Sequence, residues 1–203
     1  MPDFSPVVIS GAVEGLLDEA VVERLIEYVG GSLGPVYGRK GKGHLLQRLD
    51  GYNQAARFAP WIVLVDLNTD CSCAPPYQQL LLPLPAPHMC FRIAVRTVEA
   101  WLLADRERLA RFLGIARDIV PSNPEAVRDP KLTVVALAKR SRRRQIVQDV
   151  VPRAGSGRTV GSAYTSCLID FVRDPNTGWR PDVAANLSDS LNRCIRHLRR
   201  LLA

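Results

Sequence analysis

The fold is decided by the apolar run Trp61-Ile62-Val63-Leu64-Val65, which leads into Asp66-Leu67-Asn68-Thr69-Asp70. A second such run, Val7-Val8-Ile9-Ser10-Gly11-Ala12-Val13, stands about fifty residues earlier and ends at Glu14. Both are short, rich in β-branched residues and closed by acidic or amide side chains, which is typical of buried strands in a parallel sheet. Open α/β sheets bind ligands at the carboxyl ends of such strands. The two runs therefore predict an α/β protein with carboxylates gathered at one edge of its sheet.

Apolar spacing and Gly/Pro punctuation extend this interpretation along the chain. A helix is expected after the first strand, with Asp18 and Glu19 in its first turn, where the helix dipole favours negative charge. Residues 74–87 contain five prolines and are expected to be irregular. Further helices are expected at 44–58 and 97–113. The order predicts a mainly parallel sheet of about four strands with helices on both faces, the strands lying at Val7–Ser10, Leu33–Tyr37, Trp61–Val65 and Cys90–Val95.

The character of the chain changes after Pro121, where helical segments follow one another near 131–139, 141–150, 163–172 and 181–202. We therefore expect an α/β domain over residues 1–120 and a helical extension over 121–203 packed on it. No stretch approaches the roughly 18 apolar residues of a membrane span, and the N-terminus lacks the basic segment of a signal peptide. The expectation is a cytoplasmic protein that does not contact a membrane.

Positive charge is concentrated in the last third of the chain. The net charge is +7, and from Arg140 onward there are twelve arginines and five aspartates but no lysine or glutamate. Guanidinium groups match phosphate bidentately, so this asymmetry indicates nucleic acid or another phosphate-rich partner, although a solvated helical surface would look similar. The glycine-rich loop 38–43 adds three more cations, of which the two lysines are candidate phosphate contacts. The candidate phosphate contacts are Lys40, Lys42, Arg142, Arg143, Arg144, Arg153 and Arg158.

The acids that follow the strands resemble those of the Toprim domain of topoisomerases, primases and overcoming-lysogeny-type nucleases. Longer stretches, above all Glu99-Ala100-Trp101-Leu102-Leu103-Ala104-Asp105, resemble a bacterial Toprim-like family of unknown function. Members of that family are often encoded beside ABC-type ATPases and are implicated in phage defence. The resemblance implies a Toprim-like, Rossmann-like fold. It also implies a Mg²⁺- or Mn²⁺-dependent nuclease that cleaves DNA or RNA as the effector of a defence system with an ATPase partner.

The resemblance also implies a role for each acid. Glu14 would be the general acid/base or a metal ligand, and Asp66 would hold the metal ion as the first acid of an Asp-x-Asp motif. The second acid of that motif is replaced by Asn68, whose amide oxygen lacks the charge that attracts a cation. Asp70 and Glu99 are further candidate ligands.

Each assignment has a structural alternative. Glu14 could cap the following helix, Asp70 could form a turn, and Glu99 could form a salt bridge with Arg96 or Arg92. The main functional alternative is a catalytically silent module that binds an ATPase or nucleic acid through its arginines. A hydrolase of small phosphate esters is a third reading. The choice between DNA and RNA, and whether the chain forms a homodimer, stay open.

Overall fold

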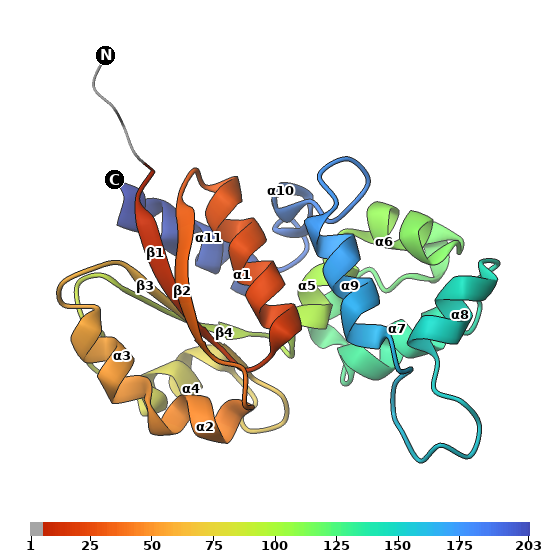
Figure 1. Cartoon of the computed structure of the whole chain (residues 1–203), viewed down its shortest axis with the longest axis horizontal. Coiled ribbons are helices and arrows are strands. Elements are labelled where there is room, and N and C mark those ends of the chain that lie inside the picture. The colour runs from red at the N-terminus through yellow and green to blue at the C-terminus, as the bar shows by residue number, and fades with distance from the viewer. Residues whose placement is uncertain (1–5) are drawn as a thin grey trace.

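The computed structural model describes residues 6–203 and contains one four-stranded parallel sheet (Figure 1). The strand order is β2-β1-β3-β4, and all three strand pairs are parallel. The α/β fold with about four parallel strands is therefore confirmed, and its architecture is Rossmann-like. The strands are β1 Val8–Val13, β2 Ser32–Gly38, β3 Trp61–Asp66 and β4 Met89–Ala94.

Both faces of the sheet are covered, which explains the unbroken apolar run of β3. Successive side chains of a strand point to opposite faces. On one face, Ile62 and Leu64 pack in a core with α1 (Leu16–Tyr28) and α11 (Asp189–Leu202). On the other face, Val63 and Val65 join a second core. That second core includes residues of α2 (Lys42–Gln47), α3 (Leu49–Ala55) and α4 (Ala74–Leu81).

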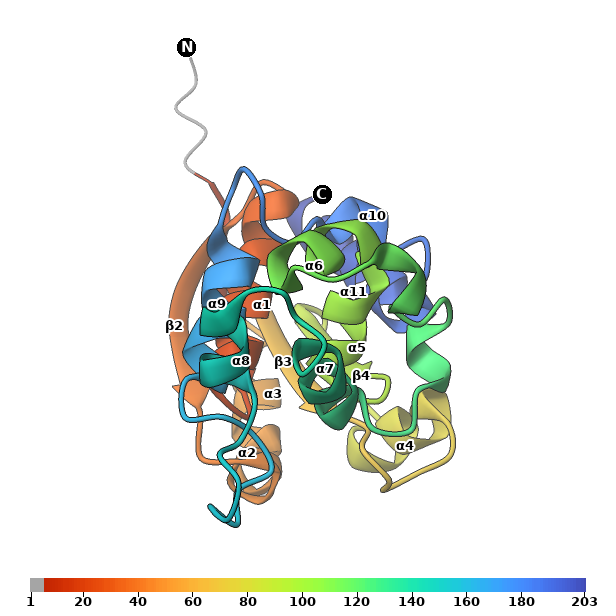
Figure 2. The same cartoon turned by 90° about the vertical axis from the view of Figure 1, so that its right-hand side faces the viewer.

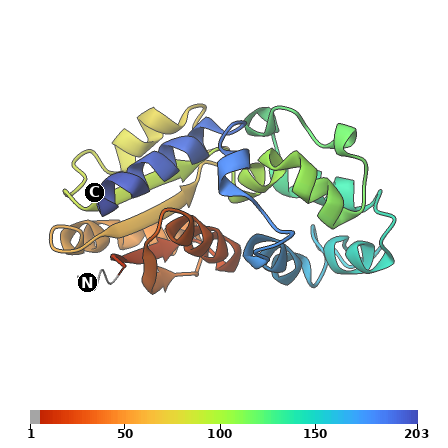
Figure 3. The ribbon, with the colours of Figure 1, turned by 90° about the horizontal axis from the view of Figure 1, so that it is seen from above.

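The remaining helices gather to one side of the sheet (Figures 2 and 3). Within this group α9 packs on α1. The last helix, α11, lies outside the group and packs on β4. The division at residue 120 stays a prediction. No helix of residues 6–203 is long and apolar enough to cross a membrane. These elements are α5 Val98–Ala104, α6 Arg106–Leu113, η1 Arg117–Ile119, η2 Pro124–Ala126, α7 Pro130–Ala138, α8 Arg144–Val150, α9 Tyr164–Arg173 and α10 Pro181–Ala184.

The prediction that 74–87 is irregular was wrong for its first half, which forms α4. Pro75 and Pro76 lie in the first turn, where backbone N–H groups have no partner within the helix and proline is tolerated. Three predicted helices are each split in two. The break at Asp105 divides 97–113, the break at Arg48 divides 44–58, and a break before Ser188 divides 181–202. Asp105 and Ser188 start new helices by accepting capping hydrogen bonds from backbone amides.

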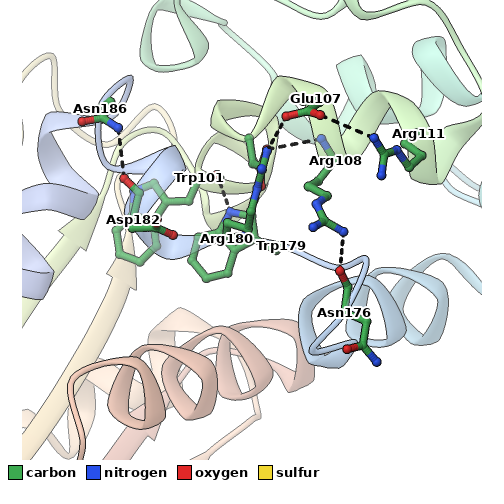
Figure 4. Close-up of polar contacts among 10 residues, drawn as sticks. Trp101, Glu107, Arg108, Arg111, Asn176, Trp179, Arg180, Asp182 and Asn186 are labelled. Atoms are coloured by element: carbon green, nitrogen blue, oxygen red, sulfur yellow. Dashed lines mark hydrogen bonds and ion pairs between the residues drawn. The ribbon is translucent and has the colours of Figure 1, made fainter.

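A buried ion pair fixes the C-terminal part of the chain to α5 and α6. Asp105 is fully buried and accepts hydrogen bonds from Arg180 Nε at 2.9 Å and Nη2 at 2.7 Å. Beside it, Trp179 Nε1 donates to the Trp101 carbonyl at 3.0 Å, and Arg180 also reaches Glu107 on the surface (Figure 4). The segment 99–105 therefore joins two parts of the fold and also carries Glu99.

Candidate active site

Four carboxylates line one pocket of about 260 Å³ at the carboxyl ends of the strands. Glu14 follows β1, and Asp66 is the last residue of β3. Asp18 lies in the first turn of α1 and Glu99 in the first turn of α5. Parallel strands bring their carboxyl ends to the same edge, which places these acids together although they are distant in sequence. We call this pocket, with Glu14, Asp18, Asp66 and Glu99 and the other residues that line it, the acid pocket.

Two of the acids are tied to the backbone around them. Glu14 Oε1 accepts a hydrogen bond from the Asp66 amide at 2.8 Å, which links the ends of β1 and β3. Asp66 Oδ1 accepts from the Val98 amide at 3.1 Å, at the start of α5. Both carboxylates are thereby oriented, and each keeps a second oxygen for which the described residues provide no hydrogen-bond partner.

The other two acids are more deeply buried, with relative exposures of 5% for Glu99 and 7% for Asp18. Glu99 accepts hydrogen bonds from the Tyr164 hydroxyl at 3.1 Å and the Thr97 hydroxyl at 2.6 Å. Asp18 differs, because its Oδ1 is buried and has no hydrogen-bond partner among the described residues. Burying a carboxylate oxygen without a hydrogen-bond partner costs free energy, so the unpartnered oxygen of Asp18 indicates a binding site for a ligand that would pair with it.

Burial and mutual repulsion raise the pKa values of three of these acids, Glu14, Asp18 and Asp66. Burial raises the pKa of Asp18 to about 7, with the neighbouring charges of Glu14 and Glu99 adding to the rise. The pKa of Asp66 is raised well above its usual value by burial first, then by Asp18, Glu99 and Glu14. Burial also raises the pKa of Glu14. Gathered carboxylates with raised pKa values are a feature of functional sites.

The donor set suits a hard divalent cation. Carboxylate oxygens are the ligands that Mg²⁺ and Mn²⁺ take, and a bound cation would relieve both the repulsion and the unpartnered oxygen of Asp18. In residues 6–203, however, no three Asp, Glu, His or Cys side chains are grouped closely enough to hold an ion as they stand. Binding therefore requires the carboxylates to draw together or to act partly through water.

The raised pKa of Asp18 predicts how stability depends on pH when no metal is present. Between about pH 4 and 7 the folded chain holds a proton on Asp18 that the unfolded chain has released, so stability falls as pH rises through this window. Asp18→Asn should flatten that fall and be more stable than the wild type at pH 8. Thermal unfolding in EDTA from pH 5 to 8 measures this, with the exposed Asp50→Asn as the control. Parallel curves for wild type and Asp18→Asn would show that Asp18 is ionised throughout.

Asn68 and Asp70 lie outside the lining of the acid pocket. Asn68 is exposed and has a left-handed backbone conformation (φ 51°). Its backbone N–H donates a hydrogen bond to the Arg96 carbonyl at 2.8 Å. Asp70 forms an ion pair with Lys42 at 2.6 Å and accepts from the Tyr77 hydroxyl at 3.0 Å. Lys42 lowers the pKa of Asp70, which stays ionised. In this arrangement Asp70 holds Lys42.

The two lysines of the loop 38–43 have different surroundings. Lys42 is largely buried and also donates to the Asp66 carbonyl, beside the acid pocket. Lys40 is exposed. The loop can pass close to the β1–α1 turn only because position 38 is glycine. Its φ is +89°, and a Cβ there would lie 2.3 Å from the Val13 carbonyl oxygen.

The predicted arginine contacts fall into two groups. Arg142, Arg143 and Arg144 are exposed around the start of α8, and Arg143 donates to the Phe112 carbonyl at 3.1 Å. Arg153 and Arg158 are exposed on the loop before α9 and line a surface hollow there. The second group is nearer to the acid pocket in the chain, because Tyr164 and Thr165, at the start of α9, line that pocket.

Three residues of the acid pocket were missed by the sequence analysis. Asp18 was explained by the helix dipole alone, although its spacing of four from Glu14 places both at the same end of α1. Tyr164 carried no signal that would connect it to Glu99 across 65 residues. Lys131 lines the pocket from α7, with its Nζ 5.6 Å from the centre of the Tyr164 ring.

Comparison of the chain with protein-family models, curated proteins and solved structures gave no significant match.

Proposed function

We propose that this chain is a metal-dependent nuclease of the Toprim type. The observation that supports it most is the acid pocket itself, in which four carboxylates from β1, α1, β3 and α5 converge and one buried oxygen lacks a partner. Lys131 supplies positive charge in the lining of the pocket, and the exposed Arg153 and Arg158 lie on the loop that leads into α9. Carboxylates that can hold a cation, with a lysine in the same lining that can attract phosphate, suit phosphodiester chemistry.

In this function Asp18, Asp66 and Glu99 would hold Mg²⁺ or Mn²⁺. A bound ion would neutralise charge on the scissile phosphate and lower the pKa of a bound water. Glu14, half-buried and with a raised pKa, is suited to hold or pass a proton at Oε1 or Oε2. Tyr164 and Thr97 fix the orientation of Glu99 through their hydroxyls. Lys131 would attract the phosphate to the pocket.

The proposed setting is phage defence with an ABC-type ATPase partner. It is supported only by the resemblance of the segment Glu99–Asp105 and its flanking motifs to the Toprim-like family. The structure adds a physical reason why that segment is distinctive. Glu99 faces the acid pocket, Trp101 donates to Ser190 Oγ at 2.8 Å, and Asp105 binds Arg180. The segment Glu99–Asp105 thus lines the acid pocket and also binds Arg180 and Ser190 in the C-terminal part of the chain.

A catalytically silent module that binds nucleic acid or an ATPase is the second candidate. It is favoured by the finding that, among the described residues, no three His, Cys, Asp or Glu side chains are grouped closely enough to hold a metal ion. The two candidates differ in one assay. A nuclease should shorten labelled DNA or RNA, single- or double-stranded, when Mg²⁺ or Mn²⁺ is present and not in EDTA. Binding without cleavage of any of these polymers at any divalent cation concentration would favour the silent module.

A further inference from the structure

Tyr37 presents an aromatic ring on the surface of the sheet, at the end of β2. Its side chain is 47% exposed although it stacks on Trp61, with ring centres 5.5 Å apart and ring planes inclined by 25°. Tyr52 stacks on Trp61 in turn, at 5.4 Å. Trp61 and Tyr52 are themselves buried. Because one face of the Tyr37 ring covers Trp61, the exposed area lies on the other face and edge.

The neighbouring rings of Trp61 and Tyr52 hold the Tyr37 side chain in one orientation before any ligand binds. Position 37 lies level with Ala12 of β1, and Trp61 lies level with Ser10 of the same strand. These small side chains leave room for the rings of β2 and β3 to meet. A tyrosine held by two further aromatic rings has already lost most of its side-chain freedom. A ligand that stacks on it therefore loses little binding energy to ordering the site.

Tyr37 is also connected to the acid pocket by a short, cationic loop. The chain continues through Gly38, Arg39 and Lys40 to Gly41, which lines the acid pocket. The Arg39 amide donates to the Val13 carbonyl at 2.9 Å, and the Gly41 amide to the Glu14 carbonyl at 3.0 Å. Four residue steps span at most about 14 Å, so the Cα atom of Tyr37 lies within that distance of Gly41 in the pocket lining.

The charges of this loop are unequal. Arg39 is paired with Glu19, with Nη2 2.7 Å from Oε1. Lys40 is exposed and takes part in no ion pair with the residues described, so its charge is available to an incoming anion. An exposed aromatic face and an available cation three residues later match a nucleotide, which offers a base to stack and a phosphate to pair.

We propose that Tyr37 is a stacking platform for an unpaired base and that the acid pocket acts on single-stranded nucleic acid. A duplex keeps its base faces covered by stacking, so only an unpaired base can lie on the ring. The acid pocket fits this reading, because Asp18 and Glu99 lie below the surface and a phosphate must enter a space of about 260 Å³ to reach them.

This inference deepens the proposed function and rests on it for the choice of nucleic acid as ligand. Its test is a binding measurement without divalent cations, so that cleavage plays no part. Fluorescence anisotropy would compare a labelled 20-nucleotide single strand with the blunt duplex of the same sequence. Wild type should prefer the single strand. Tyr37→Leu should bind the single strand about 5- to 150-fold more weakly, while Tyr37→Phe, which keeps the ring, should bind like wild type.

Duplex binding should be the same for all three proteins, and thermal unfolding of each confirms that the fold is kept. Lys40→Gln provides a second test, which removes a positive charge and leaves the aromatic rings unchanged. It should flatten the slope of log K against log salt by about 0.7 on the single strand. Equal single-strand affinity for Tyr37→Leu and wild type, or no single-strand binding by wild type, would overturn the inference. Binding with the expected Tyr37 dependence but without cleavage in Mn²⁺ would instead overturn only the nuclease.

Discussion

Glu14→Gln should lower metal-dependent cleavage by at least about 100-fold while leaving the fold intact. The substitution removes the carboxylate that would hold or pass a proton, and positioned acid–base groups contribute about 10²- to 10⁴-fold to rate. The shape of the side chain is kept, so the glutamine oxygen can still accept from the Asp66 amide. The rate of shortening of a labelled oligonucleotide in Mn²⁺ measures the effect.

Glu27→Gln on the outer part of α1 is the matched control, since its carboxylate is largely exposed and lies outside the acid pocket. Its cleavage rate should equal that of wild type. If Glu14→Gln cleaves as fast as Glu27→Gln, proton transfer does not involve Glu14, and the proposed role of this residue is wrong.

The largest effect on stability is expected from Asp105→Asn. Asp105 is fully buried and is the main partner of Arg180, and its loss leaves the partly buried guanidinium with only the surface carboxylate of Glu107 as a partner. Removing one member of a buried pair costs about 3–5 kcal/mol. For a domain of this size that corresponds to a melting temperature about 6–20 °C lower. Thermal unfolding monitored by circular dichroism measures the change.

Glu107→Gln is the control for this second substitution. Glu107 is the other acid that binds Arg180, at 2.9 Å, but it lies on the surface (Figure 4). Ion pairs exposed to water contribute little, so its loss should leave the melting temperature nearly unchanged. A similar fall for both variants would mean that Arg180 is stabilised by the total negative charge around it and not by the buried pair.

The strands were predictable because their signal is local. The runs before Glu14 and in β3 are predominantly apolar, and a parallel sheet covered on both faces favours that pattern. The breaks in the helices were harder to foresee. The spacing of apolar residues over 97–113 predicts one unbroken helix across Asp105. Only the pairing of Asp105 with Arg180, 75 residues later, shows why the helix ends there. The helix at Ala74–Leu81 was hidden by prolines that a first turn accepts.

The acid pocket was partly predictable. Glu14 and Asp66 follow strands whose carboxyl ends must meet, and Glu99 follows the strand next to β3. Asp18 could not be distinguished from an ordinary acid in a first helical turn, because its importance comes from burial beside Glu14 and Glu99. The replacement of an acid by Asn68 looked damaging in sequence, yet position 68 lies outside the lining of the pocket. Whether the site binds metal stays a proposal.

The central claim is that the acid pocket binds a divalent cation. Soaking crystals of the wild-type protein in Mn²⁺ and measuring anomalous diffraction tests it most directly, because the signal marks the ion itself. The account predicts an anomalous peak in the pocket, at coordination distance from Asp18 and Asp66 and within reach of Glu14 or Glu99. Absence of a peak at saturating Mn²⁺, or a peak only at other surface carboxylates, would contradict it.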